Sequence, residues 1–136
     1  MSRKHVRALV AYRLEQAEEA IRSAETLLAS GLHRDSVNRS YYAMFYTVLA
    51  LLITKDLGTS KHQGVIATFD QEFVKKGVFP KDLSRRLHKA FERRLEADYG
   101  ELVRVTTEDA GRVLGQAKEF VASIRSHLAQ PLGEGD

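Results

Sequence analysis

The run from Ala43 to Ile53 is the feature that most limits what this chain can fold into. Apart from Thr47, every residue in it is apolar or aromatic. The run is far shorter than the ~20 residues that a membrane-spanning helix needs. A helix that is apolar on nearly every side must lie at the centre of a bundle or bury one face in a partner chain. We therefore expect a central helix over residues 35–56, with Asp35 or Ser36 as its N-cap.

Four other stretches have the spacing of amphipathic helices. In residues 6–29 the apolar side chains recur three and four positions apart, which predicts one buried stripe on a long helix. Three more helices are expected over residues 62–76, 81–97 and about 106–128, and their ends are marked by Gly31, Gly77, Pro80 and either Thr106 or Thr107. The pattern predicts an all-α, up-and-down antiparallel bundle of four to five helices. We expect a single domain over residues 1–130 and a frayed tail over 131–136.

The composition excludes several classes of protein. The 136 residues include no cysteine, which rules out a disulfide scaffold, a thiolate metal site and a cysteine nucleophile. A net charge of +3 permits contact with a nucleic acid without requiring it. The five histidines are scattered, and no glycine-rich phosphate loop or zinc-binding pair occurs, so we expect neither a metal nor a cofactor. The N-terminus lacks the apolar stretch of a signal peptide, and we expect a cytoplasmic protein without membrane contact.

One polar cluster lies at the start of the central helix. Arg39, Tyr42 and Tyr46 are spaced i, i+3 and i+7, so they share a face and can present a cation beside two phenols. Alternatively, the tyrosines are core aromatics whose hydroxyls reach polar neighbours, and Arg39 is a surface charge.

A second cluster lies at the end of the fourth helix. Arg94 falls on the apolar stripe of that helix, and Asp98 follows it by four residues on the same face. We expect Arg94 to be semi-buried, and its replacement to cost about 3 kcal/mol if its partner is left buried and unpaired. Its guanidinium can bind a phosphate in a two-pronged manner, or it can simply lock the helix end.

A third, weaker feature lies at the turn into the third helix, where Ser60, Lys61 and His62 stand together. The free N–H groups and the dipole of a helix N-terminus favour an anion. Ordinary capping by Thr59 or Ser60 explains the same residues.

These stretches resemble the HEPN family in its small, stand-alone prokaryotic branch. The resemblance covers about residues 10–125, and it rests on four separated motifs in the same order. The motifs are Asn38-Arg39-Ser40-Tyr41-Tyr42-Ala43-Met44-Phe45, Ser60-Lys61-His62-Gln63-Gly64-Val65, Phe73-Val74 with Gly77 and Pro80, and Arg93-Arg94 with Ala97-Asp98-Tyr99.

The resemblance implies a helical bundle that is commonly a homodimer. It also implies a partner, because such proteins are often encoded beside a minimal nucleotidyltransferase in modules of toxin–antitoxin type. Many HEPN proteins are metal-independent ribonucleases with an Arg-x4–6-His motif. Here Arg93 is followed after four residues by Asp98 and then Tyr99, and none of the five histidines completes the motif. An ordinary aspartate, with a pKa near ~3.9, is a poor acid for the leaving 5′-oxygen.

We therefore predict a non-catalytic HEPN-type bundle that binds a nucleotide, an RNA or a phosphate group and pairs with a nucleotidyltransferase. One alternative is a ribonuclease toxin that uses His62 with Arg94. The other is a structural dimer without a ligand. The expected ligand-binding cluster comprises Arg39, Tyr42, Lys61, His62, Arg93, Arg94, Asp98 and Tyr99.

The order of helices in an up-and-down bundle adds an expectation about where that cluster forms. If each helix reverses the direction of the previous one, the second and fourth helices run parallel. Arg39 and Asp98 then lie at opposite ends of straight helices, so we expect a composite site at or beside a dimer interface.

Overall fold

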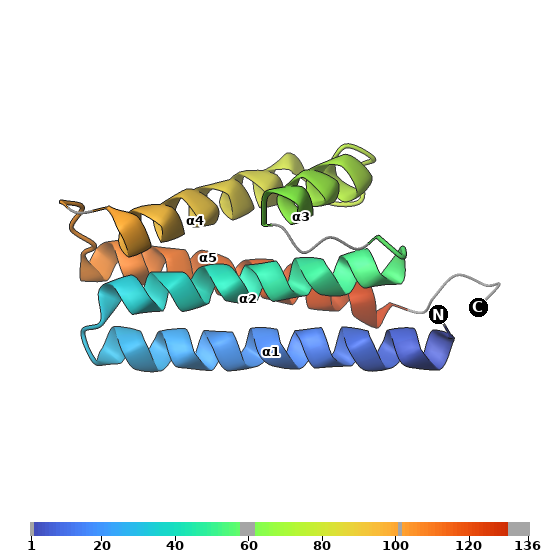
Figure 1. Ribbon diagram of the computed structural model, residues 1–136, viewed down its shortest axis with the longest axis horizontal. Coiled ribbons are helices and arrows are strands. Elements are labelled where there is room, and N and C mark those ends of the chain that lie inside the picture. The colour runs from blue at the N-terminus through green and yellow to red at the C-terminus, as the bar shows by residue number, and fades with distance from the viewer. Residues whose placement is uncertain (1, 58–61, 101, 131–136) are drawn as a thin grey trace.

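Helices account for every regular element of the described chain. The structure, a computed structural model, describes residues 2–57, 62–100 and 102–130. Within them lie α1 (Arg3–Ala29), α2 (His33–Thr54), α3 (His62–Phe69), the π-helical turn η1 (Asp70–Val74), α4 (Lys81–Tyr99) and α5 (Thr107–Ala129) (Figure 1). The predicted all-α bundle is confirmed. The expected tail, residues 131–136, lies outside the described residues.

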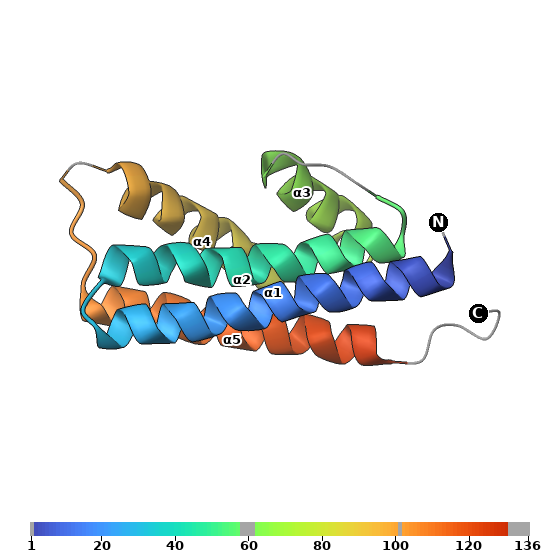
Figure 2. The same ribbon diagram turned by 60° about the horizontal axis from the view of Figure 1, so that its bottom comes forward.

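The apolar helix α2 is the centre of the bundle, as its sequence predicts. It lies between α1, α4 and α5 in both ribbon views (Figures 1 and 2). Between Ala43 and Ile53 only Tyr46, Leu49 and Ile53 keep part of their surface exposed. Thr47, the single aliphatic-hydroxyl residue of the run, is fully buried and donates its hydroxyl to the carbonyl of Met44 at 2.7 Å. A single chain therefore covers most of α2.

Three of the predicted helix ends are confirmed. Gly31 and Gly77 adopt φ angles of 77° and 81°, a region that suits glycine. Thr106 caps α5 in a capping box with Asp109, in which each side chain accepts the other residue's backbone N–H. These caps fix where α1, η1 and α5 meet their loops.

The predicted start of the second helix is wrong by two residues, and its predicted N-cap is wrong as well. The helix begins at His33, and neither Asp35 nor Ser36 is its N-cap. Ser36 is buried, and its hydroxyl donates across to the carbonyl of Ala24 in α1 at 2.8 Å. Leu32 occupies the cap position without a side-chain hydrogen bond. Tertiary packing against α1, rather than capping, sets this end of the helix.

The direction of α3 also differs from the expected alternation. The His62 ring at its start lies 4.3 Å from that of Phe45 in the middle of α2, whereas Phe73 in η1 lies 5.3 Å from the ammonium of Lys55 beyond the end of α2. Helix α3 therefore runs in the same direction as α2, and α4 runs opposite to α2 (Figure 1). The expectation that the second and fourth helices are parallel is wrong.

The predicted third helix, 62–76, divides into α3 and the π-helical turn η1. In η1 the backbone N–H of Lys75 donates to the carbonyl of Asp70, a wider turn than an α-helix has. The Asp70 carboxylate accepts the Ser84 hydroxyl at 2.6 Å and lies 2.6 Å from Nε2 of His88. These contacts fasten η1 to the first half of α4.

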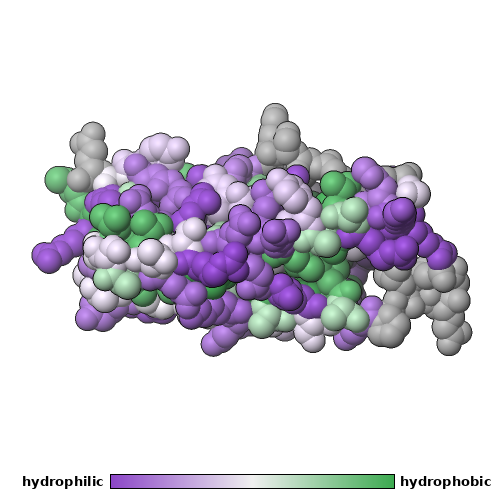
Figure 3. All heavy atoms as spheres, turned by 90° about the horizontal axis from the view of Figure 1, so that it is seen from below, coloured by the Kyte–Doolittle hydropathy of each residue, from purple (hydrophilic) through white to green (hydrophobic). Residues whose placement is uncertain are grey.

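The surface around α1 is mixed rather than uniformly apolar. Figure 3 shows this face as mostly hydrophilic, with separate apolar areas. None of the described helices has both the length and the apolar character that crossing a membrane requires.

The predicted homodimer stays a prediction, because the structure contains one chain.

Candidate functional site

Arg94 is the centre of a cluster between α2, α3 and α4. Only 12% of its side chain is exposed, and its guanidinium carbon lies 5.3 Å from the ring centre of Tyr41, 5.5 Å from that of Phe91 and 5.7 Å from that of Tyr42. Its Nη1 donates to the hydroxyl of Tyr42 at 3.3 Å. The predicted semi-burial of Arg94 is confirmed. Aromatic faces partly compensate the buried charge.

His62 reaches the same two tyrosines from the start of α3. Its ring stacks on Phe45, with 16° between the planes. A 3.0 Å hydrogen bond joins Nδ1 to the hydroxyl of Tyr41, and Nε2 lies 3.5 Å from the hydroxyl of Tyr42. Both His62 and Arg94 therefore lie next to Tyr41 and Tyr42.

Burial and charge set the protonation of this pair of phenol and imidazole. Burial, assisted by the nearby Arg94 guanidinium, lowers the pKa of His62, so the ring is neutral near pH 7. Burial raises the pKa of the Tyr41 phenol, with a smaller opposing effect of Arg94, so that hydroxyl stays protonated. Among the described residues of the cluster, the charged side chains are then arginines and one aspartate.

Asn38 and Asp98 form the rim of the cluster with Arg39. The Asn38 Oδ1 accepts from Nε and Nη2 of Arg39 at 3.1 and 2.9 Å, and its Nδ2 donates to Oδ2 of Asp98 at 3.0 Å. The guanidinium of Arg39 lies 4.7 Å from the ring centre of Tyr42. Both Arg39 and Arg94 thus lie beside the Tyr42 ring. A single chain assembles this cluster, so the expectation that it forms between two chains at a dimer interface is wrong.

The donors of Arg94 are not saturated. Its Nε is buried, yet it has no hydrogen-bond partner among the described residues. The nearest carboxylate oxygen among the described residues, Oδ2 of Asp98, lies 3.8 Å from Nη1, beyond hydrogen-bonding distance. A nearly buried guanidinium with unused donors is a suitable receptor for the oxygens of an anion. Among the described residues no group of three metal-ligating side chains accompanies it.

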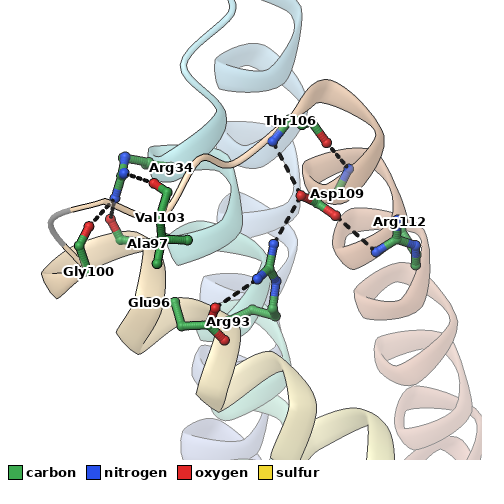
Figure 4. A network of polar contacts seen from close by, with 9 residues as sticks. All are labelled: Arg34, Arg93, Glu96, Ala97, Gly100, Val103, Thr106, Asp109 and Arg112. Carbon is green, nitrogen blue, oxygen red and sulfur yellow. Dashed lines mark hydrogen bonds and ion pairs between the residues drawn. The ribbon is translucent and has the colours of Figure 1, made fainter.

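Three of the residues predicted for this cluster lie elsewhere or are not described. Arg93 points toward α5, where its Nη2 lies 3.1 Å from the Asp109 carboxylate, and its Nη1 donates to Glu96 at 3.0 Å (Figure 4). Tyr99 is 74% exposed. Lys61 lies outside the described residues.

The network around Arg93 belongs to the corner between α4 and α5. There Arg34 of α2 donates Nη1 to the carbonyl of Ala97 at 2.6 Å and Nη2 to the carbonyl of Val103 (Figure 4). Asp109 accepts from Thr106 and Arg112, and the backbone N–H of Thr106 is the largest cause that lowers the pKa of this carboxyl. We define the corner cluster as Arg34, Arg93, Thr106 and Asp109. Its contacts join α2 and α4 to the loop before α5 and to the start of α5.

Sequence reasoning missed Asn38, Tyr41 and Phe91 as members of the Arg94 cluster, and Arg34 as the clamp of the corner. Asn38 had a usable signal, because it directly precedes Arg39 in a cluster of polar and aromatic residues. Tyr41 is absent from the predicted cluster, although its hydroxyl bonds to His62. Arg34 had no signal, since its acceptors are backbone carbonyls more than sixty residues away.

Comparison with known proteins identifies relatives over nearly the whole chain. The HEPN domain family matches residues 10–127. A UPF0332 protein of Thermotoga maritima is 40% identical over 116 residues, which cover 85% of this chain and 88% of the relative. Two proteins of Methanocaldococcus jannaschii named "Putative toxin" are 36% and 33% identical; the first match covers 95% of this chain and 96% of the relative, and the second 85% and 78%.

Proposed function

This chain belongs to the HEPN family, and on that premise we propose that its Arg94 cluster binds a phosphate group of an RNA or a nucleotide within a toxin-type module. The cluster consists of Tyr41, Tyr42, His62, Phe91 and Arg94, with Asn38, Arg39 and Asp98 at its rim. Its ligand is an anion attracted by the charge of the Arg94 guanidinium, of which Nε is enclosed and the side chain as a whole is 12% exposed.

The observation that carries this proposal is the state of Arg94. Leaving a buried donor unsatisfied costs about 1–3 kcal/mol, so a structure rarely keeps one without a reason. The Nε of Arg94 is such a donor. Arg39, on the same Tyr42 ring, adds a second positive charge against the single carboxylate of Asp98. The described cluster therefore has an excess of one positive charge, with His62 neutral.

The biological setting is proposed from the relatives. Two of them carry the word toxin in their names. The resemblance of the motifs adds a minimal nucleotidyltransferase as partner and a homodimer as the assembly. A phosphate-binding HEPN protein in such a module serves as its RNA- or nucleotide-recognising component.

Calorimetric titration with AMP, ATP and a short single-stranded RNA tests the proposal. We expect wild-type protein to bind at least one of them, and Arg94→Gln to weaken that binding about 30-fold, as the loss of a charge-assisted pair of hydrogen bonds predicts. Arg85→Gln is the matched control, because Arg85 also lies on α4 and 70% of its side chain is exposed. An equal loss of affinity in both variants would mean that only the net charge of the protein matters. If the wild-type protein binds none of the three ligands, the proposal is refuted.

A specific observation supports ribonuclease activity as a second candidate. The neutral His62 and the Arg94 guanidinium both lie beside Tyr41 and Tyr42, so a base and a cation are close together. His62 would take the proton of a 2′-hydroxyl as its oxygen attacks phosphorus, and the 5′-oxygen would leave with a proton from solvent. Cleavage of RNA in EDTA, lost in both His62→Gln and Arg94→Gln, would support it. If the RNA stays intact, ribonuclease activity is refuted and phosphate binding is the function that remains.

A further inference from the structure

Asp98 is a puzzling neighbour for a phosphate site, because it places a negative charge beside the arginine that would bind the ligand. Its Oδ2 lies 3.8 Å from Nη1 of Arg94, and 24% of its side chain is exposed. A carboxylate at that distance attracts the guanidinium without occupying its donors. The ligand therefore meets both charges together.

Asn38 holds this carboxylate in place. Its Nδ2 donates to Oδ2 of Asp98 while its Oδ1 accepts two bonds from Arg39. The two ends of an amide differ, so Asn38 binds a cation with one end and an anion with the other. Asp98 is thereby kept from closing on Arg94 in a direct two-pronged pair. Arg94 keeps its free donors.

From this geometry we infer that Asp98 is a specificity-determining residue, which makes the Arg94 site prefer a singly charged phosphodiester to a doubly charged terminal phosphate. The inference rests on the proposed phosphate-binding function. It deepens that function by naming the charge class of the ligand.

The balance of charge in the described cluster supports this selection. Two arginines and one aspartate leave one excess positive charge, which a phosphodiester neutralises. A phosphate monoester carries about −1.5 to −2 at pH 7, and its additional charge faces the carboxylate of Asp98. Repulsion between partly solvated charges a few ångströms apart amounts to about a tenfold difference in affinity. The alternative is that Asp98 only secures the end of α4, in which case ligand charge is irrelevant.

A pair of ligands that differ by one methyl group separates these possibilities. We would titrate AMP and its 5′-methyl ester into the full chain at about pH 8, where the monoester, with its second pKa near ~6, is a dianion. Wild-type protein is expected to bind the ester about tenfold more tightly. In Asp98→Asn, which keeps an acceptor oxygen for Asn38, AMP binding should tighten until the two affinities are within about twofold of each other.

Control variants make the result decisive. Asp82→Asn, a matched removal of a half-exposed carboxylate at the start of α4, should leave the preference for the ester unchanged. Asp98→Ser should reproduce the loss of preference and guards against a folding defect peculiar to the asparagine.

Each remaining outcome counts against a defined claim. If wild-type protein binds AMP as tightly as the ester, or if Asp98→Asn changes both affinities by the same factor, the inference is overturned while phosphate binding stands. If neither compound nor a short RNA binds, the proposed function fails and the inference fails with it.

Discussion

The corner cluster and the Arg94 cluster use the same side chain in opposite ways. At the corner, Arg34 donates to backbone carbonyls of Ala97 and Val103, and Arg93 contacts two carboxylates (Figure 4). In the other cluster Arg94 has aromatic rings, one phenol oxygen and a carboxylate at 3.8 Å. Arg93 and Arg94 are adjacent in the chain and lie on different faces of one helix. The number of acceptors around an arginine, rather than its burial, separates the structural role of Arg34 from the binding role that we propose for Arg94.

The physical reason is the cost of an unmade hydrogen bond. A guanidinium with five N–H donors stabilises a fold when nearby acceptors use those donors. Where acceptors are missing, the cost of the unmade hydrogen bonds offsets what the ring contacts contribute, so the same group adds little to stability. The following predictions measure this difference.

The largest effect on stability should come from the corner. Arg34→Ala removes the donor for carbonyls that join α2 to the α4–α5 loop, and we expect a loss of about 3 kcal/mol in the free energy of unfolding. Urea denaturation followed by circular dichroism measures it. Arg85→Ala, at an exposed position, should cost under about 0.5 kcal/mol. A similar small cost for Arg34→Ala would contradict the structural role of the corner.

A smaller loss is expected from the cap of α5. Thr106→Ala removes the hydroxyl that accepts the backbone N–H of Asp109 at 3.1 Å. Losing such a cap costs about 1 kcal/mol. Denaturation of Thr106→Ser, which keeps the hydroxyl, provides the comparison: the serine variant should retain most of the stability, and equal losses in both would assign the effect to the methyl group instead.

Arg94 should contribute little to stability, in contrast to Arg34. The initial expectation of a ~3 kcal/mol loss assumed a partner left buried and unpaired. Asp98 is partly exposed and bonded to Asn38, so that condition is not met. Loss of the ring contacts and removal of the unpartnered Nε oppose each other, and Arg94→Gln should change the free energy of unfolding by less than about 0.5 kcal/mol. Chemical denaturation checks this, and a loss above about 2 kcal/mol would make Arg94 a structural arginine.

The smallest effect should come from His62 and depends on pH. Because folding lowers its pKa, the unfolded chain binds the proton more readily. Its contribution to stability is therefore complete above the unfolded pKa of ~6.5 and falls as the pH drops toward the folded pKa. Thermal unfolding of wild-type and His62→Gln protein at several pH values measures the pH-dependent contribution of His62 to stability. The wild type should lose more stability on acidification, and parallel curves would count against a buried, neutral imidazole.

The sequence predicts local structure well because local rules determine it. Gly31, Gly77 and Thr106 mark helix ends through backbone conformation and capping, which depend on neighbouring residues. The apolar run of α2 likewise predicts its central place. By contrast, Ser36 was expected to cap a helix and instead bonds to α1, because an acceptor distant in sequence competes for its hydroxyl.

The site is predictable only in part, because its assembly depends on the direction in which each helix runs and on which helix each face packs against. Periodicity places Arg94 on a buried stripe, and burial follows. It does not state which way a short helix such as α3 runs, and contacts of His62 with Phe45 and of Phe73 with Lys55 determine that. Nor does it show that Arg93 finds Asp109 on α5. These are contacts between residues distant in the chain, and no spacing rule contains them.

The separate origin of His62 has a consequence for how such a site can change. Arg39, Tyr42, Arg94 and Asp98 are held by the two long helices α2 and α4, whereas His62 is the first residue of an eight-residue helix. Substitutions in or before α3 can withdraw the imidazole, or restore it, while the arginines keep their positions. The phosphate binding and the proton transfer that we propose therefore depend on different segments of the chain. A substitution at His62 can therefore remove or restore the proposed proton transfer while the arginines of the proposed anion site stay in place.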